Sequence, residues 1–260
     1  MTEQNIKFSD GASYDKMMGV WSRIVGLEFL KWLSPGNGQK WLDIGCGTGA
    51  FTEQIIENCY PQEVHGVDPS EAQLEFAKNH ASRKKAHFQV GDAMKLPFKA
   101  DEFDVSAMAL VILFVSDPAK GVGEMKRVVR SGGLVAAYAW DIFGGGFPLE
   151  PVHAVLRAKG IEYPLPASAE ISRMVNLESL WKTAGFSSVE VCEINGERKF
   201  KDFENFWNLT SSSTALKPVW KNLDSLALLD VKNATRENLK VKTGEELILS
   251  SWANAIKGNV

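Results

Sequence analysis

Short apolar runs alternate with amphipathic stretches between Trp41 and Trp140. The runs are apolar throughout, which is typical of strands that are buried on both faces of a sheet. The stretches between them carry apolar residues three to four positions apart, which predicts helices. This alternation predicts a parallel sheet covered by helices on both faces. We expect strands at 41–44, 63–67, 86–90, 103–108 and 134–140, and helices at 50–59, after the N-cap Ser70 (with Leu74, Phe76 and Ala77 facing inward) and at 118–129.

The two ends of the chain depart from this alternation. Apolar residues between 12 and 34 recur at helical spacing and predict an N-terminal helix that stops before Pro35. The glycine-rich stretch 141–148 looks like a flexible hinge. Beyond it we expect a helix at 177–184, a strand at 188–194, a mostly helical stretch at 201–241 and a final strand at 246–257.

Composition narrows the class of protein. Hydrophobic residues make up 45% and charged residues 23% of the 260, which is ordinary for a globular enzyme. The net charge of −3 argues against nucleic acid as a partner, because phosphate binding needs clustered Lys and Arg. The three cysteines are widely spaced and no Cys/His cluster stands out, so we expect neither a disulfide framework nor a metal site. No apolar run is long enough to span a membrane and the polar start lacks a signal-peptide pattern, which favours a cytoplasmic protein.

The most conspicuous motif is the loop from Gly45 to Gly49, which reads Gly-Cys-Gly-Thr-Gly and follows the first predicted strand. Glycines allow unusual backbone angles and let a ligand approach closely. The loop alone is ambiguous. With Ala50 it also satisfies the dinucleotide fingerprint G-x-G-x-x-G/A, and Asp68 stands near the position expected for an acid that binds ribose.

Three acids distinguish between the two kinds of ligand. Asp43, Asp68 and Asp92 come at or just after the ends of three successive predicted strands, at the edge where open α/β sheets bind ligands. Asp43 would repel a pyrophosphate at the helix N-terminus but attract an ammonium group. Asp92 can accept a hydrogen bond from an adenine amino group. This arrangement favours a cationic nucleoside over a polyphosphate.

Four ordered motifs resemble those of class I (Rossmann-like) S-adenosylmethionine-dependent methyltransferases of the small-molecule type. They are residues 42–49, 66–70, 91–105 and 124–133, and the resemblance covers 12–140 well and the C-terminal third loosely. Ser131 stands where the family usually has Pro, and still permits a turn. The resemblance implies an α/β, doubly wound, mostly parallel seven-stranded sheet with an N-terminal helical cap and a C-terminal helical insertion. It divides the single domain 1–260 into a cap helix (12–34), a cofactor-binding core (40–140), an acceptor-side lid region (141–241) and the final strand (246–257).

The same resemblance implies S-adenosyl-L-methionine as cofactor and S-adenosyl-L-homocysteine as product. It places the glycine loop against the methionine part with Asp43 near the amino group, Asp68 on the ribose hydroxyls, and Asp92 with Ala93 on the adenine. Residues 110–115 would line the path to the methyl group, and the N-terminal helix would close over the cofactor carboxylate, with Arg23 as its partner. The candidate cofactor-binding residues are Asp43, Gly45, Cys46, Gly47, Gly49, Asp68, Pro69, Asp92, Ala93, Leu110, Tyr14, Trp21 and Arg23.

Some of these residues also have plainer interpretations. Trp21 leans towards core packing, Cys46 suits packing better than nucleophilic attack, and Asp43 can serve nearby backbone amides. Among the histidines, His65 is expected to be structural, and His80 and His87 to be solvated. Only His153 follows the hinge where substrate would lie, so it is the one candidate for a general base.

Methyl transfer from a sulfonium is an in-line displacement that depends on alignment and exclusion of water, and needs a base only for a tightly held proton. We expect the acceptor to be a small-molecule O, N or C nucleophile, with no nucleic acid or membrane partner. Three alternatives stay open: a noncatalytic cofactor-binding module of the same fold, an NAD(P)-dependent oxidoreductase, and an enzyme that uses the same cofactor for other chemistry. The sequence leaves the oligomeric state open.

Overall fold

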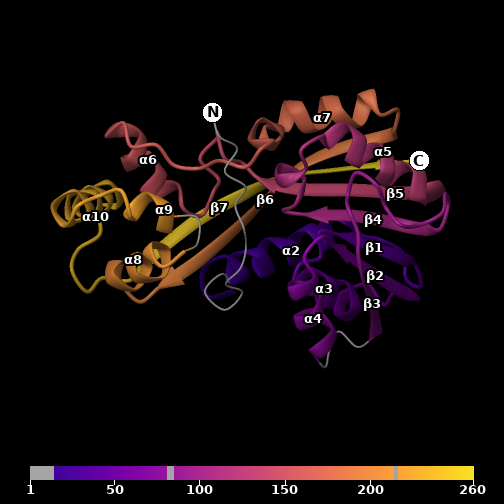
Figure 1. Ribbon diagram of the computed structural model, residues 1–260, viewed down its shortest axis with the longest axis horizontal. Helices are drawn as coiled ribbons and strands as arrows, with labels where there is room; N and C mark the ends of the chain where they lie inside the picture. The colour runs from indigo at the N-terminus through magenta and orange to yellow at the C-terminus, as the bar shows by residue number, and fades with distance from the viewer. Residues whose placement is uncertain (1–14, 81–84, 214–215) are drawn as a thin grey trace.

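A single twisted sheet organises the chain (Figure 1). The computed structural model describes residues 15–80, 85–213 and 216–260. The seven strands of this part follow the order β3-β2-β1-β4-β5-β7-β6, in which β1 to β5 run parallel and β7 runs antiparallel to β5 and β6. The mostly parallel seven-stranded sheet is confirmed. Its strands are β1 (Lys40–Ile44), β2 (Glu63–Asp68), β3 (Ala86–Val90), β4 (Phe103–Ala109), β5 (Val129–Trp140), β6 (Ser187–Phe200) and β7 (Leu247–Asn259).

Helices cover both faces of the sheet, as predicted. Lys257 of β7 donates a hydrogen bond to the Trp32 carbonyl of α2, whereas the next residue, Gly258, lies against Trp181 of α7. Successive residues of a strand point to opposite faces, so α2 and α7 pack on opposite faces of β7. α2 packs beside α3, and α5 beside α7. The helices around the sheet are η1 (Asp15–Gly19), α2 (Val20–Leu33), α3 (Ala50–Asn58), α4 (Glu71–Asn79), η3 (Ile112–Phe114), α5 (Pro118–Val128), η4 (Ala169–Ser172) and α7 (Met174–Thr183).

The strand predicted at 188–194 is longer than the sequence pattern indicates, because β6 continues to Phe200. β5 pairs with β7 only as far as Trp140 opposite Ala253, but β6 and β7 stay paired to Phe200 opposite Leu247. The two strands therefore leave the sheet as a ribbon, beyond the edge where the parallel strands end. Four helices surround the free part of this ribbon in Figure 1 and form what we call the helical lobe: α6 (Glu150–Ala158), α8 (Phe203–Ser211), α9 (Lys217–Trp220) and α10 (Ser225–Leu239).

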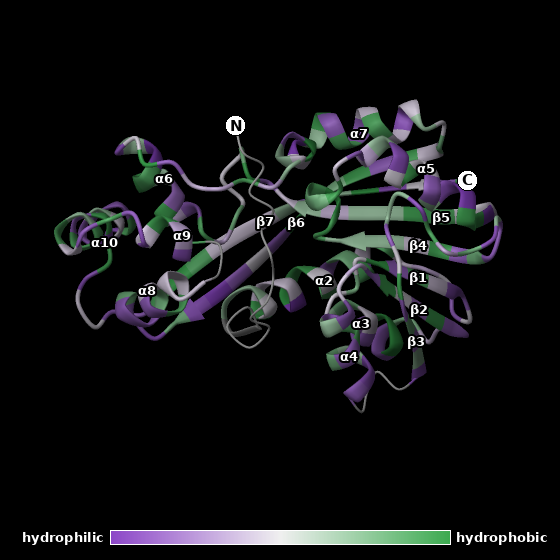
Figure 2. Cartoon of the chain, viewed as in Figure 1, coloured by the Kyte–Doolittle hydropathy of each residue, from purple (hydrophilic) through white to green (hydrophobic). Residues whose placement is uncertain are grey.

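Burial follows the hydropathy of the strands. In Figure 2 the central strands β4 and β5 are largely hydrophobic, whereas the edge strand β6 is hydrophilic over its free part. β6 is exposed at most positions, which fits an edge strand with one solvated face. One core prediction is wrong: Phe76 is 54% exposed, because its position on α4 faces solvent while Leu74 and Ala77 are buried.

The fifth strand begins earlier than predicted. Residues 131–133, expected to form a turn, belong to β5, where the Gly132 amide donates to Val260. A side chain at Gly133 would meet the Asp104 carbonyl at 2.7 Å, so a glycine is needed at this bulge. The final strand is confirmed near its predicted place, and no helix of the described residues is long and apolar enough to cross a membrane.

The predicted flexible hinge at 141–148 is wrong. The segment forms a closed turn: the Gly144 and Gly146 amides donate to Asp141, at 2.8 Å each. Trp252 of β7 holds the turn in place, since its amide donates to the Gly146 carbonyl and its carbonyl accepts from the Asp141 amide. A side chain at Gly146 would meet the Trp252 carbonyl at 2.4 Å. The glycine at this position therefore allows the turn to pack closely against β7.

Candidate cofactor site

The candidate residues gather at the carboxyl edge of the parallel strands. β1 lies between β2 and β4, so the chain leaves β1 towards one half of the sheet and later returns to the other half. Ligands of open α/β sheets bind at such a reversal of strand order. Asp68 is the last residue of β2, the glycine loop follows β1, and Leu110 follows β4. The structure therefore brings these predicted residues to one edge.

The glycine loop needs its glycines. Gly45, Gly47 and Gly49 have φ values of 72°, 53° and 82°, in the region that side chains rarely adopt. A Cβ on Gly45 would lie 2.5 Å from the Val111 side chain, which follows β4. The Gly45 amide donates to the Val67 carbonyl at 2.7 Å and fixes the start of the loop on β2. The loop is thus a tight turn whose backbone conformation requires glycine at these positions.

Asp68 joins the loop to the second strand. Its carboxylate accepts hydrogen bonds from the Gly47 amide and from the Ser70 amide, both at 2.9 Å. The side chain is buried (7% exposed), and this burial raises its pKa. Ser70 caps α4 by accepting from the Gln73 amide, as predicted, so Asp68 is free of the capping role. Pro69, between them, is exposed.

Asp43 is the most unusual group of the site. It is 1% exposed, and its Oδ2 accepts a hydrogen bond from the Thr52 hydroxyl of α3 at 2.6 Å. Its Oδ1 has no hydrogen-bond partner among the described residues. Burial raises the pKa of Asp43 to about 7, and the nearby Asp68 carboxylate adds to the shift against the hydrogen bond from Thr52. An unsatisfied buried acceptor costs free energy. An ammonium group would supply the missing donor, so this residue fits the amino acid part of S-adenosylmethionine.

Asp92 and Ala93 lie at the same edge, directly after β3. Asp92 is exposed, and its Oδ1 accepts from the Met94 amide at 2.8 Å in a local turn. The turn uses one carboxylate oxygen, so the other oxygen is available to an adenine amino group. Leu110 adopts a φ of 62° at the end of β4, and its amide donates to the Tyr138 carbonyl of β5. Non-glycine residues in this region carry strain and are often found at functional sites.

The three N-terminal candidates for cofactor binding differ in their placement. Tyr14 lies outside the described residues. Trp21 is fully buried against Trp140, with ring centroids 6.5 Å apart, as the core interpretation predicted. Its indole N–H has no partner among the described residues, so it is available to donate a hydrogen bond to an acceptor atom of a ligand. Arg23 is exposed on α2, and its carbonyl accepts a hydrogen bond from Gln54 of α3.

The Cys46 side chain is occupied with packing. The Cys46 thiol belongs to a small buried cluster with Leu74, Ala77 and Phe88, and burial raises its pKa well above the ordinary value. A thiol that stays protonated is a poor nucleophile, which agrees with the packing interpretation. The backbone of Cys46 donates to the Val67 carbonyl and keeps its place in the loop.

His153 is unsuited to act as a general base. It lies in α6, is 5% exposed and stacks on Tyr163, with ring centroids 4.1 Å apart. Burial lowers its pKa to about 3, and Arg157 adds to the shift. Such an imidazole holds a proton too weakly to serve at neutral pH. His153 was a candidate because it follows the glycine-rich turn. It lies on the buried face of the amphipathic helix α6, so its side chain points into the core of the lobe.

Comparisons with known proteins agree with this geometry. Residues 42–137 match the family described as "Methyltransferase domain". A demethylmenaquinone methyltransferase of Staphylococcus aureus is 30% identical over 198 residues, which cover 68% of this chain and 78% of that protein. This chain belongs to the class I S-adenosylmethionine-dependent methyltransferase family. S-adenosylmethionine is its cofactor, as the sequence predicts.

One further relative and one solved structure are similar to this methyltransferase. An O-methyltransferase of Penicillium expansum is 34% identical over 166 residues, covering 62% of this chain but only 57% of that enzyme. A solved phosphoethanolamine N-methyltransferase of Haemonchus contortus, in complex with S-adenosyl-L-methionine, is 20% identical with a TM-score of 0.56. That match covers 95% of this chain and 56% of the solved one, and at this identity it shows the fold alone.

One residue of the candidate site, Thr52, escaped the sequence analysis. Thr52 is the hydroxyl that binds Asp43, and Val111 is the side chain that packs on Gly45. A polar residue on the otherwise buried face of α3 was the available indication for Thr52. Val111 falls within the predicted segment 110–115, but its contact with Gly45 could not be foreseen, because that contact depends on the pairing of β1 with β4.

Proposed function

We propose that this methyltransferase moves a methyl group from S-adenosylmethionine to a small-molecule O, N or C nucleophile by in-line displacement. The observation that carries the proposal is the unsatisfied, buried Oδ1 of Asp43 at the edge where Asp68 fixes the glycine loop. It favours a cationic amino acid moiety and disfavours the pyrophosphate of a nicotinamide cofactor. The names of the two curated relatives, an O-methyltransferase and a demethylmenaquinone methyltransferase, support methyl transfer.

In this proposal the residues of the site bind and orient the cofactor. Asp43 accepts from the amino group, the loop from Gly45 to Gly49 packs on the methionine part, and Asp68 receives the ribose hydroxyls. Asp92 accepts from the adenine amino group while the Ala93 amide serves a ring nitrogen. The bound cofactor supplies a methyl group that is already activated by the positive sulfur. The protein then contributes alignment and exclusion of water.

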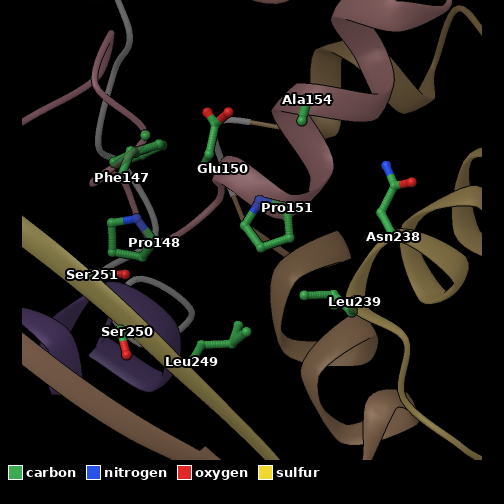
Figure 3. A pocket seen from close by; sticks show the side chains of 11 residues that line it. Phe147, Pro148, Glu150, Pro151, Ala154, Asn238, Leu239, Leu249, Ser250 and Ser251 are labelled. Atoms are coloured by element: carbon green, nitrogen blue, oxygen red, sulfur yellow. The ribbon is translucent and has the colours of Figure 1, made fainter.

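The acceptor enters, in this proposal, between the sheet edge and the helical lobe. The ribbon of β6 and β7 carries the lobe past the edge that holds Asp43 and Asp68, so the lobe lies on the correct side of the sheet. A cavity of about 200 Å³ lies between α6, α10 and β7 (Figure 3). It is smaller than the roughly 300–1,000 Å³ of ordinary ligand sites. We therefore assign this cavity to packing of the lobe and keep the acceptor at the sheet edge.

Product analysis tests the function. The chain is incubated with a donor carrying a labelled methyl group and a panel of metabolites, and each reaction is examined for labelled product and for S-adenosylhomocysteine. We expect one chemical class of acceptor to be labelled. Binding of S-adenosylhomocysteine without label in any product would instead favour a noncatalytic module of the same fold.

A segment exchange tests the role of the lobe. Replacing residues 141–241 with the matching segment of a relative that methylates a different acceptor should move the acceptor preference towards that relative. An unchanged preference would contradict the assignment of this segment to the acceptor side.

A further inference from the structure

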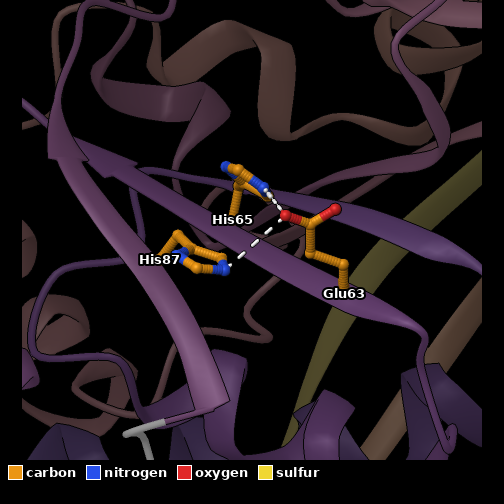
Figure 4. Close-up of side chains that lie close together, drawn as sticks. All are labelled: Glu63, His65 and His87. Carbon is orange, nitrogen blue, oxygen red and sulfur yellow. Dashed lines mark hydrogen bonds and ion pairs between the residues drawn. The ribbon is translucent and has the colours of Figure 1, made fainter.

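Three metal-ligating side chains meet at the other end of the sheet. Glu63 and His65 are two residues apart on β2, so both point to the same face. β2 pairs in parallel with β3, and His65 lies opposite His87 in this register. Figure 4 shows the three side chains converging on that face. Within the described part of the chain, they are the one group of His, Cys, Asp and Glu whose ligand atoms come close enough to share an ion.

The distances fit a single ion. Glu63 Oε1 lies 2.7 Å from His65 Nε2 and 3.6 Å from His87 Nε2, and the three atoms lie within 4.8 Å of one another. Tetrahedral zinc, with bonds of about 2.0–2.1 Å, separates its ligand atoms by about 3.3 Å. The Glu63–His65 contact is a hydrogen bond that is shorter than this spacing and the Glu63–His87 contact is slightly longer, so the side chains would shift to admit the ion.

One oxygen of Glu63 is left for an ion. Lys40 of β1 lies 3.3 Å from Oε2, the oxygen that faces away from the imidazoles, and Lys40 also pairs with Glu102 at 3.6 Å. Oε1 is the atom that both imidazoles approach. Lys40 therefore orients the carboxylate for a single-oxygen contact and does not occupy the ligand position.

The surroundings hold the imidazoles and leave room for a further ligand. The chain between β3 and β4 crosses this face without forming a helix, and its segment 96–99 lines a cavity of about 580 Å³ together with His65 and His87. The Phe98 and Phe103 rings make T-shaped contacts with the His65 ring, with centroids 5.6 Å and 5.4 Å away, and pack around it. The fourth position of a tetrahedral ion would open into the cavity and be filled by water.

We propose that Glu63, His65 and His87 form a binding site for a divalent transition-metal ion of the zinc type. Two imidazoles and one carboxylate are ligands that such ions prefer over magnesium or calcium. The site lies at the start of β2, where Glu63 is five residues and about 17 Å, and His65 three residues and about 10 Å, from Asp68 at the end of the strand. The ion has no contact with the methyl-transfer site. It fastens the edge strand β3 to β2 and so stabilises the sheet.

A Co²⁺ titration of the full chain, free of any affinity tag, tests this site by visible absorption. We expect one equivalent to bind with a tetrahedral spectrum that lacks a thiolate charge-transfer band, and Zn²⁺ to displace it. His87→Gln should weaken binding at least tenfold, and Glu63→Gln should do the same. His80→Gln is the matched control, because His80 is another half-exposed histidine with a nearby carboxylate, Glu53, and lies outside the cluster.

The outcomes separate clearly. The proposal fails if no tetrahedral spectrum develops, if His80→Gln weakens binding as much as His87→Gln, or if a thiolate band places the ion on a cysteine. His87 is 66% exposed, so its replacement leaves the fold intact. Binding of S-adenosylhomocysteine should be the same in the His87→Gln variant, which keeps this test independent of the proposed methyl transfer.

Discussion

The backbone amide of Gly47 donates a hydrogen bond to the carboxylate of Asp68 across 2.9 Å. This contact fixes the middle of the glycine loop to the end of the neighbouring strand. Each carboxylate oxygen of Asp68 accepts one backbone amide and can accept a second hydrogen bond, so both oxygens are still available to a ligand. The same residue therefore shapes the loop and can receive the ribose.

Replacing Asp68 should weaken cofactor binding more than it weakens the fold. Asp68→Asn keeps one oxygen for the Gly47 amide but loses the charge that receives the ribose hydroxyls. Hydrogen bonds to charged groups contribute about 1.5–3 kcal/mol, so we expect a loss of about ten- to a hundredfold in affinity for S-adenosylhomocysteine by calorimetry. Asp224→Asn removes an exposed acid that caps α10 and serves as control, with unchanged affinity. Equal affinity of the wild type and Asp68→Asn would refute the ribose role.

The raised pKa of Asp43 predicts a pH dependence of stability. Its pKa is about 7 in the folded chain against an ordinary 3.8, so the folded state binds the proton more tightly than the unfolded state. The corresponding stability is fully present below pH 4 and is lost as the pH rises through 7. In urea unfolding of the cofactor-free chain, the wild type should lose more stability between pH 5 and pH 8 than Asp43→Asn. Parallel pH profiles for the two proteins would count against the assigned pKa.

The same carboxyl predicts a pH dependence of binding. An ammonium group is attracted only by the ionised form of Asp43, whose fraction rises about eightfold between pH 6 and pH 7.5 for a pKa of about 7. Affinity for S-adenosylhomocysteine should rise by about this factor, and binding at pH 7 should release protons. Calorimetry in two buffers of different ionisation enthalpy measures the proton release. Asp43→Asn should abolish it, and proton uptake would reverse the proposed charge pairing.

The glycine loop predicts a sharp contrast between two Gly→Ala substitutions. Gly45→Ala places a Cβ 2.5 Å from Val111 on a backbone with φ of 72°, and should destabilise the chain by about 1–3 kcal/mol. Gly123→Ala is the matched control, because Gly123 is exposed in α5 with no described atom within 4 Å of the new Cβ. It should leave stability equal or raise it by up to about 1 kcal/mol. Urea unfolding measures both, and equal effects would show that the loop tolerates side chains.

A substitution of His153 tests whether methyl transfer proceeds without a general base from the helical lobe. His153→Phe keeps the aromatic stack on Tyr163 and removes both ring nitrogens. We expect the kcat for methyl transfer, with the acceptor that the product analysis finds, to stay within about twofold and its pH profile to keep its shape. Loss of the limb near neutral pH would show that His153 moves a proton after all.

Much of the fold was accessible from the sequence because its information is local. The apolar runs identify the parallel strands, and the ordered motifs place the glycine loop, Asp68 and Asp92 at one edge. What could not be predicted depends on pairing between distant segments. Trp252 holds the turn at Asp141 across 111 residues, and glycines that suggested mobility instead allow this contact. The approach of His65 and His87 likewise depends on the register of β2 with β3, which no spacing along the chain reveals.

Ligand selectivity at the sheet edge tests the central claim most directly. Calorimetry with S-adenosylhomocysteine, S-adenosylmethionine and NAD, on the same preparation at pH 7.5, measures it. The site described above predicts binding of one equivalent of S-adenosylhomocysteine and S-adenosylmethionine in the micromolar range or tighter, with no heat from NAD. Micromolar binding of NAD, together with no binding of S-adenosylhomocysteine, would contradict the assignment.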